Sequence, residues 1–298
     1  MTTVASLDEI DRIHDDEPDR AAAGLRALDA AALPVDRLPL VAFLTIHVLG
    51  EKLGQWAEAA DRLEHLRTTR PDAPLAVAAH AAAAAHLAGR ADDPALAALS
   101  AAGGRAEAKT LTTLNALDRR PPPDPAALAV ELERLAHVSQ NFDPGGPLIR
   151  PLAIGFNNTT SRLLDLGTAP IAPGIKSALL AGSAAALRFW QAAGTWVNFE
   201  RALYLRALVH NRIGEPAAAR ADCLQALDTI AANGNEEIDQ AFLQLQLAGA
   251  LLRLGETAEG QRHLAEARAA AAGWDDAGLK SWFAGEHDRL FSTAENTA

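Results

Sequence analysis

Apolar residues recur along most of this chain at the three- and four-residue spacing of helices that bury one face. With the breaks at glycine and proline, the spacing predicts about fifteen helices, paired as antiparallel hairpins. One pattern of about thirty residues occurs at least three times, most clearly from Leu40 to Pro71. Helical pairs that repeat in this way stack into a solenoid with a concave inner face. We therefore predict an all-α chain.

The spacing inside the repeat resembles the tetratricopeptide repeat. In the first copy the shared positions are Gly54, Trp56, Ala59, Leu63 and Pro71. Two further copies match the pattern at Ala207, Gly214, Ala219 and Ala226, and at Ala248, Gly255, Leu264 and Ala267. The resemblance implies a right-handed α-α superhelix of about seven helical hairpins with a C-terminal capping helix. It also implies a scaffold for proteins or peptides, the work that most such repeats do.

The copies depart from the repeat pattern at identifiable positions. His47 stands where the first helix normally has glycine or alanine, and Leu66 replaces a small residue. Arg206 occupies a slot that is normally apolar, and Gly260 replaces an alanine. These repeats are therefore irregular.

Three consecutive prolines, Pro121 to Pro123, mark the best candidate boundary because a helix cannot continue through them. We expect residues 1–120 and 121–298 to form two sets of tetratricopeptide-like hairpins within one continuous solenoid. Residues 275–291 combine apolar Trp282 and Phe283 with charged side chains, as a terminal capping helix requires.

Composition and charge narrow the classes of partner. Acidic residues outnumber basic ones by 38 to 27, for a formal charge of −11, and no basic run exceeds two residues. Nucleic-acid binding normally needs a concentrated basic face, so we expect no nucleic-acid partner. No window approaches the length of a membrane span, and the first residues do not form a signal peptide. We therefore expect a cytoplasmic protein without a membrane partner.

In a tetratricopeptide-like stack, set positions of each first helix point into the groove. Counted back from the glycine turns, these positions are Asn157, Asn158, Ser161, Asp165, Arg201, Tyr204, Asn211, Arg212, Phe242, Gln246, Gly249 and Arg253. The proposed peptide-binding residues among them are Asn157, Asn158, Ser161, Arg201, Tyr204, Asn211, Gln246 and Arg253. The best repeat has Val41, Thr45 and Val48 at equivalent positions, which does not support a receptor for acidic peptide tails.

Asn157 and Asn158 lie in the most polar run inside any long predicted helix. An asparagine side chain both donates and accepts hydrogen bonds, so it can hold the backbone of an extended peptide. The same groups would otherwise bond to neighbouring helices or face water. The sequence leaves both interpretations open.

Catalytic and metal chemistry has little support in the sequence. Cys223 is the single cysteine and falls where the repeat needs a small apolar residue. None of the nine histidines forms a ligand-spaced pair with a carboxylate within one helix. We therefore expect no enzyme, no cofactor and no metal site.

Two alternatives to an open scaffold remain. The long helices around Phe189, Trp190 and Trp196 could wall a C-terminal pocket of a sensor for a small molecule or short signalling peptide. Trp282 and Phe283 could instead make the contact of a homodimer, which their exposure in the monomer would support.

Overall fold

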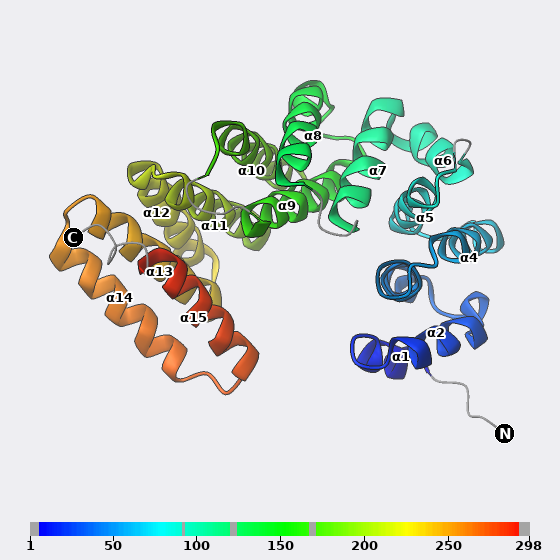
Figure 1. The fold of residues 1–298 in the computed structure, drawn as a ribbon, viewed down its shortest axis with the longest axis horizontal. Coiled ribbons are helices and arrows are strands. Elements are labelled where there is room, and N and C mark those ends of the chain that lie inside the picture. The colour runs from blue at the N-terminus through cyan, green and yellow to red at the C-terminus, as the bar shows by residue number, and fades with distance from the viewer. Residues whose placement is uncertain (1–5, 91–92, 120–123, 167–170, 292–298) are drawn as a thin grey trace. The chain divides into compact units, whose positions relative to one another are not determined.

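The computed structural model describes residues 6–90, 93–119, 124–166 and 171–291, and every regular element in them is helical (Figure 1). The expectation of an all-α chain is thus confirmed for the described part. The α-helices are α1 (Leu7–Ile13), α2 (Pro18–Ala27), α3 (Leu38–Leu44), α4 (Trp56–Thr69), α5 (Leu75–Leu87), α6 (Pro94–Gly103), α7 (Arg105–Arg119), α8 (Pro125–Val138), α9 (Ile149–Leu166), α10 (Pro173–Ala193), α11 (Trp196–Ile213), α12 (Pro216–Asn233), α13 (Glu237–Arg253), α14 (Thr257–Ala272) and α15 (Ala277–Phe291). The short 3₁₀ segments are η1 (Ala30–Ala32), η2 (Val35–Arg37) and η4 (Ser139–Asn141), and η3 (Thr45–Lys52) is a π-helix.

The chain divides into two compact units. The first unit comprises Met1–Leu128 and Val138–Thr159, and the second comprises Ala129–His137 and Thr160–Ala298. The proline run that suggested a boundary, residues 121–123, lies outside the described residues.

The predicted glycine turns are present. Gly54, Gly214 and Gly255 have φ angles of +69°, +86° and +81°, in the left-handed region that side chains with a Cβ rarely adopt. Each glycine follows the first helix of a pair and lets the chain reverse into the second. The repeat positions that carried the tetratricopeptide resemblance are therefore real hairpin turns.

Packing between paired helices also follows the repeat positions. Ala219, Cys223 and Ala226 are completely buried where α12 packs against α11. Gly260 takes the place of an alanine because a Cβ there would lie 2.8 Å from Leu252 Cγ, so α13 and α14 approach closely. Small residues at these positions set the separation of the helices within each hairpin.

The first helix of the best repeat differs from the simple α-helix expected for residues 40–54. It begins as α3 and continues as the π-helix η3, which contains His47 and Gly50. A Cβ at Gly50 would lie 2.3 Å from the Trp56 ring, so the indole packs directly on the η3 backbone. The turn of a π-helix is wider than that of an α-helix, because its hydrogen bonds join residues i and i+5. The side chains after Leu44 therefore point in other directions around the helix axis than they would in an α-helix.

Helix α15 packs against α13 and α14 at the end of the second unit (Figure 1). Phe242 on α13 is the centre of an aromatic cluster in which its ring centroid lies 4.3 Å from that of Trp282 and 5.5 Å from that of Phe283. Phe283 is buried, whereas Trp282 is 52% exposed. Only one member of the pair predicted for a dimer contact is therefore on the surface.

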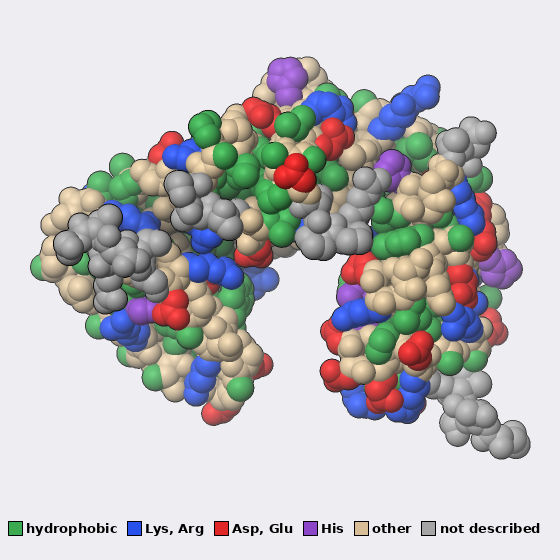
Figure 2. Space-filling model, in the orientation of Figure 1, with side chains coloured by type: hydrophobic (Ala, Val, Ile, Leu, Met, Phe, Trp, Pro, Cys, Tyr) green, Lys and Arg blue, Asp and Glu red, His purple; other side chains and the backbone are tan. Residues whose placement is uncertain are grey.

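Charged side chains of both signs are interspersed over the face shown in Figure 2. No helix among the described residues combines the length and the apolar character of a membrane span.

Candidate functional site

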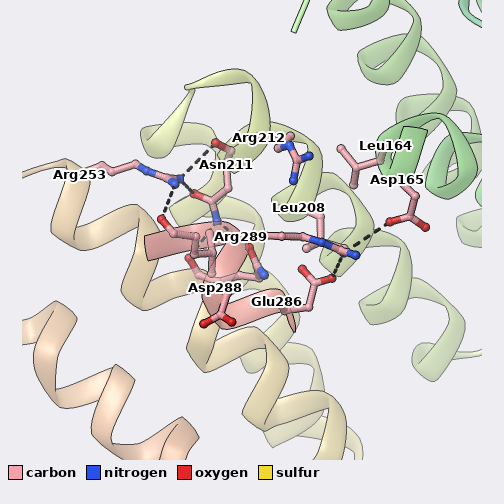
Figure 3. A pocket seen from close by; sticks show the side chains of 11 residues that line it. Leu164, Asp165, Leu208, Asn211, Arg212, Arg253, Glu286, Asp288 and Arg289 are labelled. Atoms are coloured by element: carbon pink, nitrogen blue, oxygen red, sulfur yellow. Dashed lines mark hydrogen bonds and ion pairs between the residues drawn. The ribbon is translucent and has the colours of Figure 1, made fainter. Parts of the chain in front are cut away.

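A pocket of about 530 Å³ lies in the second unit, within the size range of ligand sites in proteins (Figure 3). Helices α9, α11, α13 and α15 form its walls. The residues that line it are Leu164, Asp165, Leu208, Asn211, Arg212, Gln246, Arg253, Glu286, Asp288, Arg289 and Leu290.

Helical spacing brings these side chains to one place. Leu208, Asn211 and Arg212 are three and four residues apart on α11, and therefore share one face. Gln246 and Arg253 are seven residues apart on α13, which again places them on one face. Both α11 and α13 are first helices of their hairpins, so the pocket uses the positions at which the repeat pattern predicts a groove.

A hydrogen-bond network joins the walls. Asn211 Nδ2 donates to the backbone oxygen and to Oε1 of Gln246, both at 3.0 Å. Arg253 donates to the backbone oxygen and to Oδ1 of Asn211 at 3.2 Å, and to the backbone oxygen of Leu290 at 3.0 Å. The network thus connects α11, α13 and α15 and fixes the orientation of the amide groups (Figure 3).

Gln246 contributes a donor that lacks an acceptor. Its side chain is 1% exposed, and its Nε2 atom is buried without a hydrogen-bond partner among the described residues. Leaving a buried amide donor unsatisfied costs about 1–3 kcal/mol. A ligand oxygen that reached this atom would recover that free energy.

Ionic groups from α15 and α9 complete the pocket. Arg289 forms ion pairs with Glu286 on its own helix and, at 3.5 Å, with Asp165 on α9. Burial raises the pKa of the Glu286 carboxyl, against the opposing effect of Arg289. Burial also lowers the pKa of Arg253. The pocket therefore holds charges of both signs, and three of them, Asp165, Glu286 and Arg289, are paired with one another.

The structure places three of the eight predicted peptide-binding residues in this pocket, namely Asn211, Gln246 and Arg253. Asp165 and Arg212, which were also expected to face the groove, line it as well. Ser161 is half-buried on α9.

Arg201 and Tyr204 lie on α11 outside the pocket lining. Arg201 is exposed and pairs with Asp239 at 2.7 Å. Tyr204 packs against Phe242 with a ring-centroid distance of 6.2 Å, and its hydroxyl is buried without a hydrogen-bond partner among the described residues. Burial raises the pKa of Tyr204 well above its usual value.

Asn157 and Asn158 belong to the first unit, so they are not part of this pocket. Asn157 is half-buried and Asn158 is exposed. In the same polar run Thr159 and Thr160 are completely buried, and Thr159 Oγ1 donates to the Leu114 backbone oxygen at 3.4 Å. Part of the run therefore packs between helices, while the two asparagines remain available for hydrogen bonds to a ligand.

Sequence reasoning missed the contribution of α15. Glu286, Arg289 and Leu290 line the pocket, but α15 lies beyond the last repeat, where the groove positions of the repeat cannot be counted. The available signal was its alternation of charged and apolar residues, which we interpreted as a capping helix.

The aromatic residues proposed for a sensor pocket do not line this one. Phe189 and Trp190 are buried on α10, and the Trp196 ring packs against Gly234 at the end of α12. Cys223 is completely buried, and burial raises the pKa of its thiol far above the usual range. A thiol in that setting is a packing group.

The pocket thus combines oriented amides, paired charges and three leucines contributed by α9, α11, α13 and α15. Such a lining can bind a peptide-like ligand through polar and apolar contacts together. No protein-family model matches this sequence, and no curated protein matches it either.

Proposed function

We propose that this protein is a non-enzymatic cytoplasmic scaffold that binds a protein or peptide segment in the groove of a tetratricopeptide-like solenoid. The pocket in the second unit would be the anchoring site. One observation carries the proposal: Asn211, Gln246 and Arg253, chosen from the repeat pattern as groove residues, line a single cavity.

The chemistry of the pocket suits a peptide segment. A peptide backbone offers both N–H donors and C=O acceptors, and needs partners for both. Asn211 and Gln246 carry donors and acceptors, and Gln246 Nε2 still lacks an acceptor among the described residues. Leu164, Leu208 and Leu290 supply apolar contacts for a side chain. A cavity of about 530 Å³ holds an anchor of a few residues, and the rest of a ligand would extend beyond it.

Filling the pocket tests the proposal. Leu208 is half-buried on α11 and lines the cavity, so Leu208→Trp would occupy it. Leu224 is 40% exposed on α12 in the same unit and outside the lining, so Leu224→Trp adds the same bulk without blocking the pocket. Phage-displayed random peptides would be selected on the purified full chain, and the affinities of enriched peptides measured by fluorescence anisotropy.

We expect the enriched peptides to bind the parent chain and Leu224→Trp equally. Their affinity for Leu208→Trp should fall by about tenfold or more, because an anchor loses most of its binding energy when its pocket is filled. Circular dichroism of both variants controls for folding. Enriched peptides that bind Leu208→Trp as tightly as the parent would place the binding site elsewhere, and a failure to enrich any peptide would contradict a peptide scaffold.

A further inference from the structure

Three side chains with metal-ligand chemistry converge in the first unit, away from the pocket. His14 and Asp15 directly follow α1, and His47 lies on the π-helix η3. One ligand atom from each of the three residues lies within 4.8 Å of the other two. His14 Nε2 is 3.3 Å from Asp15 Oδ2, and His47 Nε2 is 3.2 Å from Asp15 Oδ1.

The other nitrogen of each imidazole is already engaged. His14 Nδ1 lies against the backbone oxygen of Asp11, and His47 Nδ1 is 2.7 Å from Glu51 Oε2. A carbonyl or carboxylate oxygen can only accept, so each Nδ1 donates its proton to the oxygen beside it. Metal-binding histidines show this arrangement, with the outer ring nitrogen donating to a carbonyl or carboxylate. Nε2 of each ring faces an Asp15 oxygen at the distance of a hydrogen bond, and a metal ion bound there would take the place of any proton on Nε2.

The spacing fits a tetrahedral site. Zinc bonds of about 2.0 Å place neighbouring ligand atoms about 3.3 Å apart in a tetrahedron. The two histidine-to-carboxylate distances, 3.3 Å to Asp15 Oδ2 and 3.2 Å to Asp15 Oδ1, have that length but end on different oxygens, so the exposed carboxylate must turn to bring one oxygen to both histidines. Two imidazoles and one carboxylate occupy three positions and leave a fourth open, a ligand set that zinc and similar transition metals take in proteins.

The local structure holds His47 in place. Its ring stacks on Phe43 at a centroid distance of 5.5 Å and an interplanar angle of 9°. Position 47 is also where the repeat normally has glycine or alanine, so the imidazole replaces a small packing residue. The π-helical turn that carries it is a rare feature that occurs frequently at functional sites.

We propose that His14, Asp15 and His47 bind a zinc ion, or a divalent transition metal of similar preference. The metal would tie the end of α1 to η3, two elements 33 residues apart at their histidines. Lys52 Nζ lies 2.8 Å from Asp15 Oδ1 and holds the carboxylate next to the histidines, but its positive charge opposes a metal ion there. The site therefore binds metal more weakly than its three ligands alone would.

Calorimetric titration of the EDTA-treated full chain with zinc chloride tests the proposal, with magnesium chloride as the oxygen-preferring control. We expect one zinc ion per chain and no magnesium binding. His47→Ala should weaken zinc binding by about a hundredfold, and Glu51→Gln by about tenfold, because a neutral amide oxygen accepts from His47 Nδ1 more weakly than the carboxylate does. His65→Ala, at an exposed position on α4, should bind like the parent.

Two further variants keep the outcome decisive. Asp15 is exposed, so Asp15→Asn removes a ligand with little risk to folding and should also abolish tight zinc binding. Lys52→Met removes the competing cation and should tighten zinc binding several-fold, a gain that a purely structural ion pair does not predict. Absence of saturable zinc binding, or equal affinities for His47→Ala, Asp15→Asn and His65→Ala, would overturn the site and indicate adventitious binding only.

Discussion

The two units differ in the polarity of their groove positions. In the first unit the best-matched repeat places Val41, Thr45 and Val48 there, and all three are buried, although Val41 and Thr45 also line a cavity of about 460 Å³. In the second unit the equivalent first helices place Asn211 and Gln246 in a pocket, although their repeats match the pattern less completely. Agreement with the repeat pattern therefore identifies helical packing, and departures toward polar residues identify the candidate binding surface.

The units also bury ionisable groups of opposite character. In the first unit, burial and the charge of Arg119 lower the pKa of His80 to about 3. In the second unit, burial and the neighbouring Asp239 raise the pKa of Glu200 to about 8. Both groups are neutral at neutral pH, because a buried charge without full compensation is costly. Acid and alkali should therefore destabilise different units.

Replacement of Glu200 has the largest expected effect on the free energy of unfolding. Its pKa is higher in the folded than in the unfolded chain, so the folded state holds an extra proton between about pH 4.5 and pH 8. The stabilisation that this proton gives to the folded chain is fully present below pH 4.5 and is lost as the pH rises to 8. The free energy of unfolding falls by up to about 1.4 kcal/mol per pH unit in that range. Urea denaturation of Glu200→Gln should show a flatter pH dependence, whereas Glu237→Gln, exposed on α13, should follow the parent. Parallel curves for Glu200→Gln and the parent would contradict a neutral Glu200.

His80 should act in the opposite direction. Its folded pKa of about 3 is below the unfolded value, so the unfolded chain binds the extra proton at mildly acidic pH. Stability from a neutral His80 is complete above about pH 6.5 and is lost as the pH falls toward 3. Between pH 6.5 and pH 5, the protection factors for amide hydrogen exchange in α5 should fall more in the parent than in His80→Gln. An exposed His65→Gln serves as the matched control, and an equal fall in all three proteins would remove His80 as the cause.

Gly182 tests whether the second unit unfolds by itself. A Cβ at this position of α10 would lie 2.4 Å from Thr160 Oγ1 and 2.9 Å from Leu132 Cδ2, inside the second unit. Gly182→Val should therefore destabilise that unit by about 3 kcal/mol. Gly174→Val, on the same helix with no atom within 4 Å of its Cβ, is the control. Hydrogen exchange should become faster in the second unit only; equal acceleration in both would mean that the units unfold together.

Arg253 tests the connection between α15 and the inner helices. Arg253→Ala removes the bonds to Asn211 and to the Leu290 backbone oxygen, at an expected cost of about 2 kcal/mol. Amide hydrogen exchange should accelerate more in α15 than in the other helices. Arg262→Ala on α14 removes two surface ion pairs and a contact to His263, all within its own helix, and should change stability by less than Arg253→Ala, about 0.5 kcal/mol. Unchanged protection of α15 in Arg253→Ala would show that its aromatic contacts alone hold it.

The helices were predictable because their signals are local. Helix α12, for example, continues through Ala231 and Ala232 to Asn233 and ends before Gly234, as the glycine breaks predict. The apolar spacing does not reveal the π-helix η3, in which Trp56 packs closely on Gly50.

The candidate site was predictable only where it lies on repeats. Position counting along α11 and α13 found Asn211, Gln246 and Arg253. It could not place Arg289, because α15 has no repeat register and reaches the pocket through tertiary packing. It also missed His14 with His47, because residues 33 positions apart show no ligand spacing in the sequence and are brought together by the fold.

The smallest expected effect concerns Asn157 and Asn158, the predicted groove residues of the first unit. Neither lines the pocket, and Asn158 is exposed, so replacing both with alanine should leave the unfolding free energy nearly unchanged. We expect the double variant to bind pocket-selected peptides as tightly as the parent, because every residue that lines the pocket belongs to the second unit. Anisotropy titration beside Leu208→Trp measures this. A loss of affinity in the double variant comparable to that in Leu208→Trp would contradict a binding site confined to the second unit.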